Sequence, residues 1–329
     1  MFLSIIVPAY NVAPYIERCI RSLEAQDIPK NEYEIIVTND GSPDNCKEIV
    51  EELQKEFSNI VLINQENQGV SMARNNAIAI SKGTYILPID PDDYVVSNTF
   101  QQIFNKLKKQ DLDVLYLSFE IFNEAGLSSW KTNYRELEKN NYNGIEGYYA
   151  GRDYGVKDPD RSWAILYKRE LLDTFNIRYP KNVPYLEDGL FLGKVFTVAT
   201  KVAFDNNKFY QRTTRPGSAT NSNLFFSEKA IKGFIKAAQD IKLFAANTKL
   251  TIEQKGLVNH VVAKFVFLSI VPSTSSFDFK AYFKIIKFLK SKGLGKLKFE
   301  GVRFLYYNYI KVYNVSKLFF LIYFRFYKK

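Results

Sequence analysis

Short apolar runs alternate with stretches of helical periodicity along the first part of this 329-residue chain. In the helical stretches, apolar residues recur every three or four positions, as on one buried helix face. The runs are almost continuously apolar, which is typical of strands buried on both sides of a sheet. The alternation predicts an α/β fold with a mostly parallel central sheet flanked by helices. The expected strands cover 3–10, 33–40, 60–65, 84–90 and 112–119, and the expected helices cover 12–23, 42–57 and 70–80.

Two prolines refine this pattern. Ser42 stands directly before Pro43. A serine N-cap followed by proline at the first helical position is a common helix start, so the second helix is expected to begin at Pro43. Pro88 lies inside the fourth strand and lacks the N–H that a sheet ladder uses. It predicts a bulge or a local edge at that point of the sheet.

Polar clusters follow four of the expected strands, where each strand ends. Ligands of such sheets bind beyond the carboxyl ends of the strands, so the clusters are expected to meet at one rim. A turn-and-cap role for the second cluster and a surface position for Arg74 are the alternatives. The chain has no P-loop and no G-x-G-x-x-G, which excludes by motif a Walker nucleotidase and a dinucleotide dehydrogenase. The clusters are Pro8–Asn11, Asn39–Asp44, Asn64–Asn75 and Asp90–Asp93.

The fourth cluster holds three carboxylates within four positions, Asp90, Asp92 and Asp93. Like charges this close disfavour one another's ionisation, so the arrangement needs a positive partner. Carboxylate oxygens at a strand end suit a hard divalent cation, Mg²⁺ or Mn²⁺, that keeps positions for phosphate oxygens. The alternative is that Asp92 or Asp93 caps the following helix, which accounts for one carboxylate but not for three.

Charge and aromatic residues change the picture near the C-terminus. Residues 1–200 hold 21 Lys and Arg against 29 Asp and Glu, whereas residues 201–329 hold 24 against 6. The basic part interleaves Lys and Arg with aromatic residues, and its longest apolar run, 318–324, is far shorter than the ~20 residues of a membrane span. Such segments are typical of helices that lie on an anionic leaflet, so a peripheral membrane surface is the expected partner. An amphipathic helix packed against the rest of the protein is the alternative.

The two cysteines, Cys19 and Cys46, both fall on apolar faces of the expected helices. Buried free thiols are therefore expected rather than a disulfide, which fits a reducing, cytoplasmic compartment. The N-terminal apolar run has no basic leader and ends at Pro8, so it is expected to be a strand rather than a signal peptide. Basic and aromatic side chains together also suit single-stranded nucleic acid. That function leaves the acidic rim without a role, so no nucleic-acid partner is expected.

The motifs "VPAYN", "TNDGSPD", "NQGVSMARN" and "DPDDYV", in this order and spacing, resemble those of the family 2 glycosyltransferases, which have the nucleotide-diphospho-sugar transferase (GT-A) fold. The last of them matches the family's D-x-D-D pattern, with Pro91 at the variable position. Further resemblance lies in Ser162–Leu172, Tyr185–Phe191 and Tyr210–Asn221. The family implies a GT-A catalytic domain at 1–221, made of a nucleotide-sugar half at 1–119 and an acceptor half at 120–221. From the change in composition, residues 222–329 are expected to form a helical region that contacts the membrane surface or the acceptor.

The resemblance also implies roles for residues that match the family's motifs. Pro8 and Tyr10 would line the base pocket, and Asp40 would hydrogen-bond the base. Asp92 would ligate the metal that bridges the diphosphate, and Asp90 would contact the ribose or the metal. The other donor contacts would be Arg74, toward base or phosphate, and Arg212 and Arg215, toward the leaving diphosphate. A surface position is the alternative for Arg212 and Arg215.

Glu187 and Asp188 match the family's Glu-Asp pair, in which the aspartate is the general base and the glutamate lies on the acceptor side. A carboxylate within hydrogen-bond reach can take the proton of an attacking sugar hydroxyl, and a single displacement inverts C1. Capping of the following helix is the alternative for the pair. Trp163 would stack on an acceptor sugar or else belong to the core. His260 would be structural in an apolar helix, with metal ligation as the alternative.

These expectations describe an inverting, metal-dependent glycosyltransferase. It would move a sugar from a nucleotide-diphospho-sugar, with a UDP-sugar as the first choice, to a lipid-linked saccharide or polysaccharide acceptor. It would be cytoplasmic and peripheral on the inner face of the plasma membrane. A sugar-nucleotidyltransferase shares the broad fold, but such enzymes usually open with a glycine-rich phosphate loop, which is absent after "SIIVP".

Overall fold

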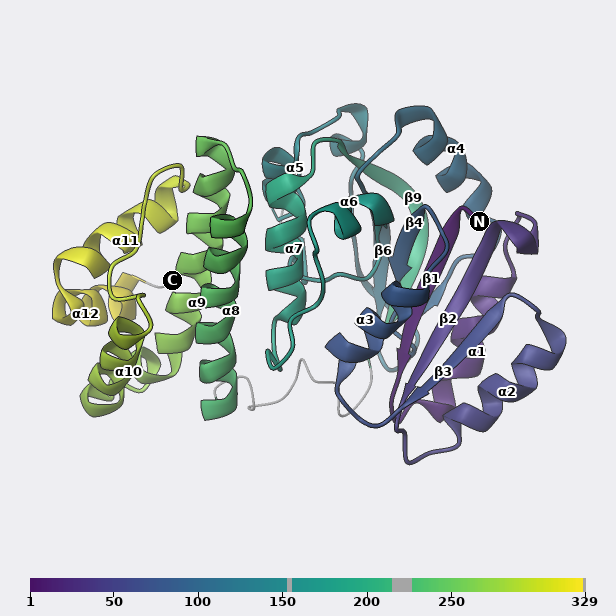
Figure 1. The fold of residues 1–329 in the computed structure, drawn as a ribbon, viewed down its shortest axis with the longest axis horizontal. Coiled ribbons are helices and arrows are strands. Elements are labelled where there is room, and N and C mark those ends of the chain that lie inside the picture. Colours follow the sequence, from purple (N-terminus) through teal and green to yellow (C-terminus); the bar gives the residue numbers. More distant parts are fainter. Residues whose placement is uncertain (153–155, 215–226, 328–329) are drawn as a thin grey trace. The chain divides into compact units, whose positions relative to one another are not determined.

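The computed structural model describes residues 1–152, 156–214 and 227–327. By its internal contacts the chain divides into two compact units (Figure 1). Met1–Tyr179 and Ala199–Ser218 form the first unit, and Pro180–Val198 and Ala219–Lys329 form the second. The sequence predicted a division at residue 221. The structure differs from it for residues 180–198, which pack with the C-terminal helices rather than with the sheet unit.

The first unit holds the sheet and the N-terminal helices. Its strands are β1 (Leu3–Ala9), β2 (Tyr33–Asp40), β3 (Ile60–Gln65), β4 (Tyr85–Pro88), β5 (Tyr94–Val95), β6 (Val114–Phe122), β7 (Ser128–Lys131), β8 (Ile165–Lys168) and β9 (Val202–Thr213). Its helices are α1 (Ala13–Glu24), α2 (Cys46–Glu56), α3 (Val70–Ile80), α4 (Phe100–Gln110), α5 (Gly144–Ala150) and α6 (Arg169–Thr174), with 3₁₀ turns η1 (Lys30–Glu32) and η2 (Leu137–Lys139).

The strands form one mixed sheet in the order β3-β2-β1-β4-β8-β6-β9-β5, with β7 paired to β6. β1 pairs in parallel with β2 and β4, and β2 pairs in parallel with β3. β8 runs antiparallel to both β4 and β6, whereas β6 and β9 are parallel. The parallel half brings the carboxyl ends of β1 to β4 to one edge, as the strand pattern predicted. The predicted α/β fold with a helical C-terminal region is confirmed.

Pro88 ends β4 at a local edge of the sheet. β4 pairs with β1 as far as Pro88, but with β8 only at Tyr85 and Ile86. The N–H of Ile89 donates to the carbonyl of Ile6, so alternate N–H groups of this strand point toward β1. The nitrogen of Pro88 therefore points toward β8, where the pairing of β4 has already ended. No hydrogen bond of the sheet is lost because proline has no N–H. The expected local edge is confirmed.

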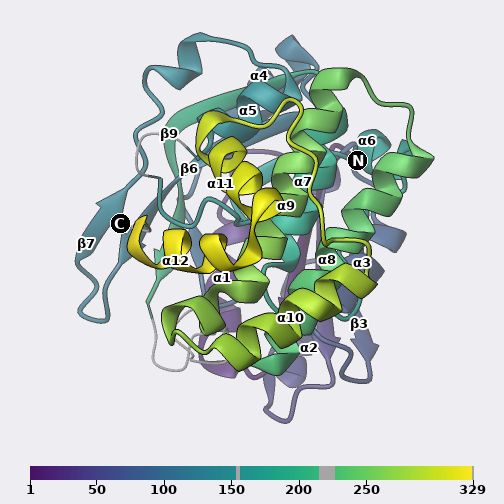
Figure 2. The ribbon, with the colours of Figure 1, turned by 90° about the vertical axis from the view of Figure 1, so that its left-hand side faces the viewer.

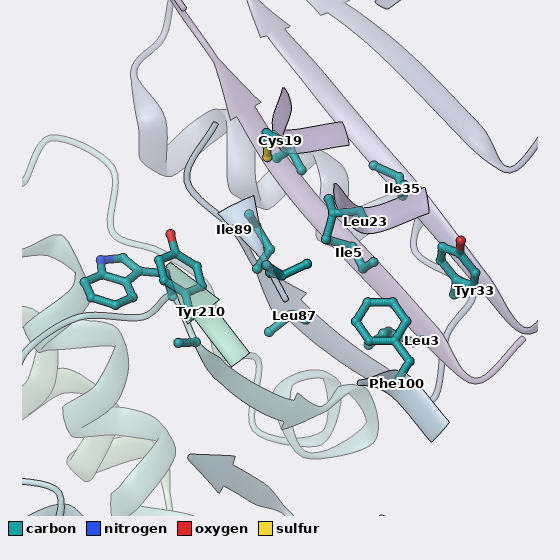
Figure 3. Close-up of a cluster of buried hydrophobic side chains, with 14 of the residues drawn as sticks. Leu3, Ile5, Cys19, Leu23, Tyr33, Ile35, Leu87, Ile89, Phe100 and Tyr210 are labelled. Atoms are coloured by element: carbon teal, nitrogen blue, oxygen red, sulfur yellow. The ribbon is translucent and has the colours of Figure 1, made fainter. Parts of the chain in front are cut away.

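The main core lies on the face of the sheet that α1 and α4 cover (Figure 3). Leu3 and Ile5 of β1 meet Cys19 and Leu23 of α1 there, and Phe100 of α4 packs edge-on against the ring of Tyr33. The apolar residues of α3 are absent from this cluster although α3 contacts β1 and β2, so α3 covers the other face. Both cysteines are buried and free, as predicted.

The second unit is helical, and its central element is α9 (Ile252–Ser275). Five helices pack against α9. Residues Ile252–Thr274 are long and apolar enough to cross a membrane, with a mean hydropathy of 1.5, but 78% of that window is buried inside the structure. Burial by neighbouring helices accounts for this apolar composition. The partners of α9 are α7 (Glu187–Val198), α8 (Glu228–Asn247), α10 (Phe279–Ser291), α11 (Phe304–Val315) and α12 (Lys317–Tyr327).

Two details of α9 show why its sequence suits a packed helix. His260 is only 7% exposed, and its ring lies 4.3 Å from that of Tyr306 on α11. The structure thus supports the structural role expected for this histidine. Gly256 allows the loop at Gly301 to approach, because a Cβ built on Gly256 would lie 2.7 Å from both the Cα and the carbonyl oxygen of Gly301.

Gly256→Ala is therefore expected to destabilise the protein. Alanine favours a helix over glycine by up to about 1 kcal/mol, but the contact with backbone at Gly301 cannot be relieved by a side-chain rotation. We expect a net loss of about 1–2 kcal/mol of unfolding free energy, measured by urea denaturation followed by circular dichroism. The control is Lys255→Ala, at an exposed neighbouring position. Equal stability of the two variants would contradict this close contact.

Candidate nucleotide-sugar site

The loops that follow β1 and β2 are tied together by a serine and an aspartate. The N–H of Asn11 donates to Ser42 Oγ at 2.7 Å, and the N–H of Ala13, the first residue of α1, donates to Asp44 Oδ2 at 2.7 Å. Ser42 Oγ–H in turn donates to Asp44 Oδ1 at 2.6 Å. Two of the predicted polar clusters therefore meet, and these hydrogen bonds hold them in register.

The same contacts correct the predicted start of the second helix. α2 begins at Cys46 rather than at Pro43, and Ser42 is not its N-cap. The N–H of Cys46 donates to Asp44 Oδ1 at 3.2 Å. Burial raises the pKa of Asp44, but hydrogen bonds from Ser42, Ala13 and Cys46 outweigh it and lower the pKa to about 2. The turn-and-cap alternative for the second cluster therefore describes Asp44, for which the sequence alone predicted no particular contact.

Asp40 joins the end of β2 to the loop before α3. Its carboxylate is 3% exposed and accepts hydrogen bonds from Gln65 Nε2 at 2.7 Å, from the N–H of Gln68 at 2.7 Å and from the N–H of Gly69 at 2.8 Å. Gly69 has φ of 87°, a conformation that glycine adopts without strain. Asp40 therefore fixes the start of α3, and its contact with a nucleobase remains a prediction.

Arg74 and Asp90 form an ion pair that connects α3 to the end of β4. Arg74 Nη2 lies 2.9 Å from Asp90 Oδ1. The arginine side chain is 4% exposed and the aspartate side chain 28%, so the pair opens to solvent on the carboxylate side. The guanidinium carbon also lies 5.1 Å from the ring centre of Tyr179. A surface position for Arg74 is thus wrong, and two predicted donor-site residues are in direct contact.

The carboxylate of Asp93 has a structural role, because it is buried and hydrogen-bonded to β9. It is 3% exposed and accepts hydrogen bonds from Tyr210 Oη at 2.6 Å and from the N–H of Thr213 at 2.7 Å, both on β9. Burial first, and then the charges of Asp92 and Asp90, raise the pKa of Asp93 well above its ordinary value, against these hydrogen bonds, which lower it. Asp93 therefore anchors the carboxylate loop to a strand that follows it by more than a hundred residues.

The backbone around Asp92 is held from two sides. Its carbonyl oxygen accepts from Arg18 Nη2 at 2.8 Å and from Thr213 Oγ1 at 2.6 Å. Its side chain is half-buried. In the described residues no three His, Cys, Asp or Glu side chains gather as a metal site. Mg²⁺ and Mn²⁺ at diphosphates commonly use one or two protein carboxylates and take other oxygens from the phosphates, so the oxygens of Asp90 and Asp92 are suitable donors.

The remaining donor residues of the first unit lie as follows. Pro8 is buried in β1 beside Thr38, and Tyr10, just beyond the strand, is 50% exposed. Arg212, on β9, forms an ion pair with Asp158 and is 24% exposed. Its contact with a diphosphate remains a prediction. Arg215 lies outside the described residues.

Trp163 belongs to the core, which corrects its assignment to the acceptor. It is 6% exposed, stacks on the ring of Tyr210 at 4.7 Å and meets the ring of Phe119 edge-on at 4.9 Å. An indole so enclosed offers little surface to a sugar. Because Tyr210 also holds Asp93, Trp163 supports the carboxylate loop through the packing beneath it.

Glu187 and Asp188 open α7 in the second unit, in its first turn, and both are half-buried. Leu186, directly before them, has φ of 56°. For a bulky residue without glycine's freedom this left-handed conformation is strained, and such strain is concentrated at functional sites. The structure thus places the predicted base at a helix start with an unusual backbone. Its role as base, and that of Glu187 on the acceptor side, remain predictions.

Comparisons with known proteins identify the family to which this chain belongs. The family described as "Glycosyl transferase family 2" matches residues 4–174. That match covers more than half of the chain and includes all four rim clusters, so the chain belongs to glycosyl transferase family 2.

Two curated relatives illustrate the range of the family. The Bacillus subtilis protein named uncharacterized glycosyltransferase EpsJ is 33% identical over 228 residues, which are 66% of this chain and 62% of that protein. Staphylococcus aureus TarS, named a poly(ribitol-phosphate) beta-N-acetylglucosaminyltransferase, is 28% identical over 68% of this chain and 37% of its own length. The matches therefore span less than two thirds of either relative.

Two solved structures share the fold. Staphylococcus aureus TarS 1–349 in complex with UDP-GlcNAc aligns with a TM-score of 0.71 and 20% identity, over 99% of this chain and 92% of that one. The mannosyltransferase PcManGT from Pyrobaculum calidifontis, in complex with GDP-Man and Mn²⁺, aligns with a TM-score of 0.50 and 13% identity, over 99% and 87%. At these identities the likeness concerns the fold.

The Ser42–Asp44 contact predicts a pH dependence of stability. The folded pKa of Asp44, about 2, lies below the ~3.9 of an unfolded aspartate, so its contribution is complete above pH ~4 and is lost as pH falls toward 2. Asp44→Asn is expected to reduce the unfolding free energy by about 1–2 kcal/mol at pH 7 and by much less at pH 2. Urea unfolding across this range measures both, with Glu124→Gln, an exposed loop carboxylate, as the control. A pH-independent difference between wild type and Asp44→Asn would contradict the assignment.

Proposed function

We propose that this protein transfers a sugar from a UDP-linked donor to a hydroxyl of a saccharide or polyol-phosphate acceptor, with inversion at C1. The observation that carries the proposal is the Arg74–Asp90 ion pair. It joins α3 to the carboxylate loop at the end of the parallel strands, where ligands of such sheets bind. Membership of the family and the UDP-GlcNAc complex of the structurally similar TarS support the nature of the donor.

The donor would lie along the rim that these contacts build. Tyr10 offers an exposed ring for a nucleobase, and Asp40 holds backbone N–H groups at the start of α3 in a fixed place. Arg74, buried and always charged, contributes positive charge close to the carboxylates.

Asp90 and Asp92 would hold Mg²⁺ or Mn²⁺ against the diphosphate. When bound, such a cation neutralises negative charge that develops on the departing nucleotide. The Mn²⁺ complex of the structurally similar mannosyltransferase supports this proposal. Asp93 would not ligate the cation directly, because its carboxylate is buried against Tyr210 and Thr213.

The proton of the acceptor hydroxyl would pass to Asp188. The carboxylate takes the proton as the hydroxyl oxygen bonds to C1 and the bond from C1 to the diphosphate breaks, so a single displacement inverts the configuration. The support is the match of "YLEDGLF" to the family's Glu-Asp pair and the strained backbone of Leu186 directly before it.

The acceptor would be a cell-surface polymer or its lipid-linked precursor. Relatives named for poly(ribitol-phosphate) glycosylation, from Staphylococcus aureus and from Bacillus spizizenii, support a repeating polyol or saccharide chain with free hydroxyls. The donor can be identified by thermal-shift assays with a panel of UDP- and GDP-sugars in the presence of Mn²⁺. A ligand at 100-fold its dissociation constant stabilises the folded protein by about 2.7 kcal/mol, so the true donor should raise the unfolding temperature most.

Asp92→Asn is expected to weaken metal-dependent UDP binding. Wild-type protein should bind UDP tightly with Mg²⁺ or Mn²⁺ and weakly in EDTA, because carboxylates repel a bare diphosphate. The variant should lose at least about tenfold in affinity with metal, which corresponds to about 1.4 kcal/mol. Titration calorimetry measures both, with Glu51→Gln, an exposed carboxylate on α2, as the control. UDP affinity that is unchanged by EDTA in the wild type would refute the metal assignment.

Asp188→Asn is expected to lower turnover by about 10²–10⁴-fold, the usual contribution of a general base. UDP affinity should barely change, because the amide keeps the shape of the side chain and the residue is not a proposed metal ligand. Sugar transfer and UDP binding are measured side by side in this variant and in Asp92→Asn. Near wild-type transfer, or a loss of UDP affinity like that of Asp92→Asn, would exclude Asp188 as the base and make Glu187 the next candidate.

A further inference from the structure

Exposed apolar side chains concentrate at the C-terminal end of the second unit. Among the described residues, nine of the sixteen large apolar side chains that are exposed lie between Phe277 and Ile322. The same part of the chain is strongly basic, since residues 276–329 hold 13 Lys and Arg against two Asp and Glu. Scattered single apolar residues are ordinary on a protein surface, whereas a concentration of them marks an interaction site.

Helix α10 combines both properties on one side. Its buried residues, Tyr282, Ile286 and Leu289, recur every three or four positions and define the inner side. On the outer side Phe279 is 44% exposed and Phe283 43% exposed. At 100° per residue, the outer side also carries four exposed lysines between and beside these rings. The lysines are Lys280, Lys284, Lys287 and Lys290.

Helix α12 adds an apolar stripe next to α10. Leu318, Phe319 and Ile322 are 50%, 55% and 40% exposed. The two helices are in contact, because the hydroxyl of Tyr282 on α10 donates to the carbonyl of Lys317 on α12 at 2.8 Å. Both lie on the side of α9 that is turned away from α7 (Figure 2).

We propose that the outer sides of α10 and α12 form a binding surface for anionic lipid bilayers, the α10–α12 face. The exposed phenylalanine, leucine and isoleucine side chains enter the region between headgroups and acyl chains, and the lysines contact anionic headgroups. An interfacial helix is recognised by this pairing of an apolar surface with Lys and Arg. The unit lies on the bilayer and does not cross it, because the span-length helix α9 is the core around which the others pack.

Charge and side-chain chemistry favour an anionic lipid surface over the other possible binding partners of the α10–α12 face. A second copy of the chain would bring two strongly basic surfaces together, which like-charge repulsion disfavours. Single-stranded nucleic acid would match the charge and could stack on phenylalanine, but the aliphatic side chains of Leu318 and Ile322 offer no ring for a base. An anionic bilayer satisfies both the charge and the aliphatic residues.

The test is co-sedimentation of the full chain with vesicles of phosphatidylcholine alone or with added phosphatidylglycerol. Binding is expected only with phosphatidylglycerol and should weaken as salt rises, since exposed charges are screened within ~8 Å at physiological ionic strength. Neutralising the four lysines of α10 should weaken binding by at least about 100-fold, because each lysine near an anionic surface contributes about fivefold. The variant combines Lys280→Gln, Lys284→Gln, Lys287→Gln and Lys290→Gln.

Two further variants separate this face from net charge and from misfolding. Replacing the stripe of α12 with serine should also abolish vesicle binding, while far-ultraviolet circular dichroism and the thermal midpoint stay close to wild type because these positions are exposed. Neutralising four exposed lysines of the first unit removes the same charge and should leave binding within about twofold. The stripe variant is Leu318→Ser, Phe319→Ser and Ile322→Ser, and the control is Lys55→Gln, Lys82→Gln, Lys109→Gln and Lys208→Gln.

Three results would overturn the proposal. Equal binding to neutral and anionic vesicles would show that the lysines do not bind anionic headgroups. Equal losses in the α10 variant and the control would show a general charge effect rather than a defined face. Binding of a single-stranded oligonucleotide that depends on the α10 lysines, in protein that ignores vesicles, would assign the face to nucleic acid. None of these measurements involves a nucleotide-sugar, so their outcome is independent of the proposed transfer reaction.

Discussion

Repulsion among three carboxylates at the end of β4 is the constraint around which the sheet unit is organised. The protein gives two of them different partners. Asp93 turns inward, where Tyr210 and Thr213 of β9 bind it, and Asp90 meets the guanidinium of Arg74 from α3. Separate partners let the loop hold its three carboxyl groups close together, and the loop thereby connects α3, β4 and β9 at one edge of the sheet.

The parts of the fold that depend on local pattern were predictable from the sequence. Continuous apolar runs gave the strands β1 to β4 and β6, because a strand buried on both faces tolerates little else. The edge at Pro88 was predictable since proline lacks a donor whatever its surroundings. The start of α2 was not, because Ser42 and Asp44 accept hydrogen bonds from the N–H groups of Asn11 and Ala13, each 31 residues earlier, and α2 begins only at Cys46.

The candidate site was predictable as a set of motifs but not as a set of contacts. Only the resemblance to the family predicted Arg74 as a donor-site residue, because the sequence around it does not show that its side chain is buried beside Asp90. Trp163 was misassigned because an aromatic residue before a strand looks the same whether its ring meets a sugar or another ring. Its stacking on Tyr210 involves residues 47 positions apart, which no local periodicity records. Long-range pairs of this kind decide which polar residues serve the fold and which remain for a ligand.

The membership of α7 in the helical unit limits how this protein can be divided. Nine of its twelve residues are buried, and its glycine at 193 lies where a Cβ would be 3.1 Å from the side chains of Ile241 on α8 and Val261 on α9. A chain shortened to residue 221 would keep every rim motif, yet it would strip α8 and α9 from this helix and leave its apolar surface in water. Such a fragment would be prone to aggregate, so the sheet and the helices have to be expressed together as one chain.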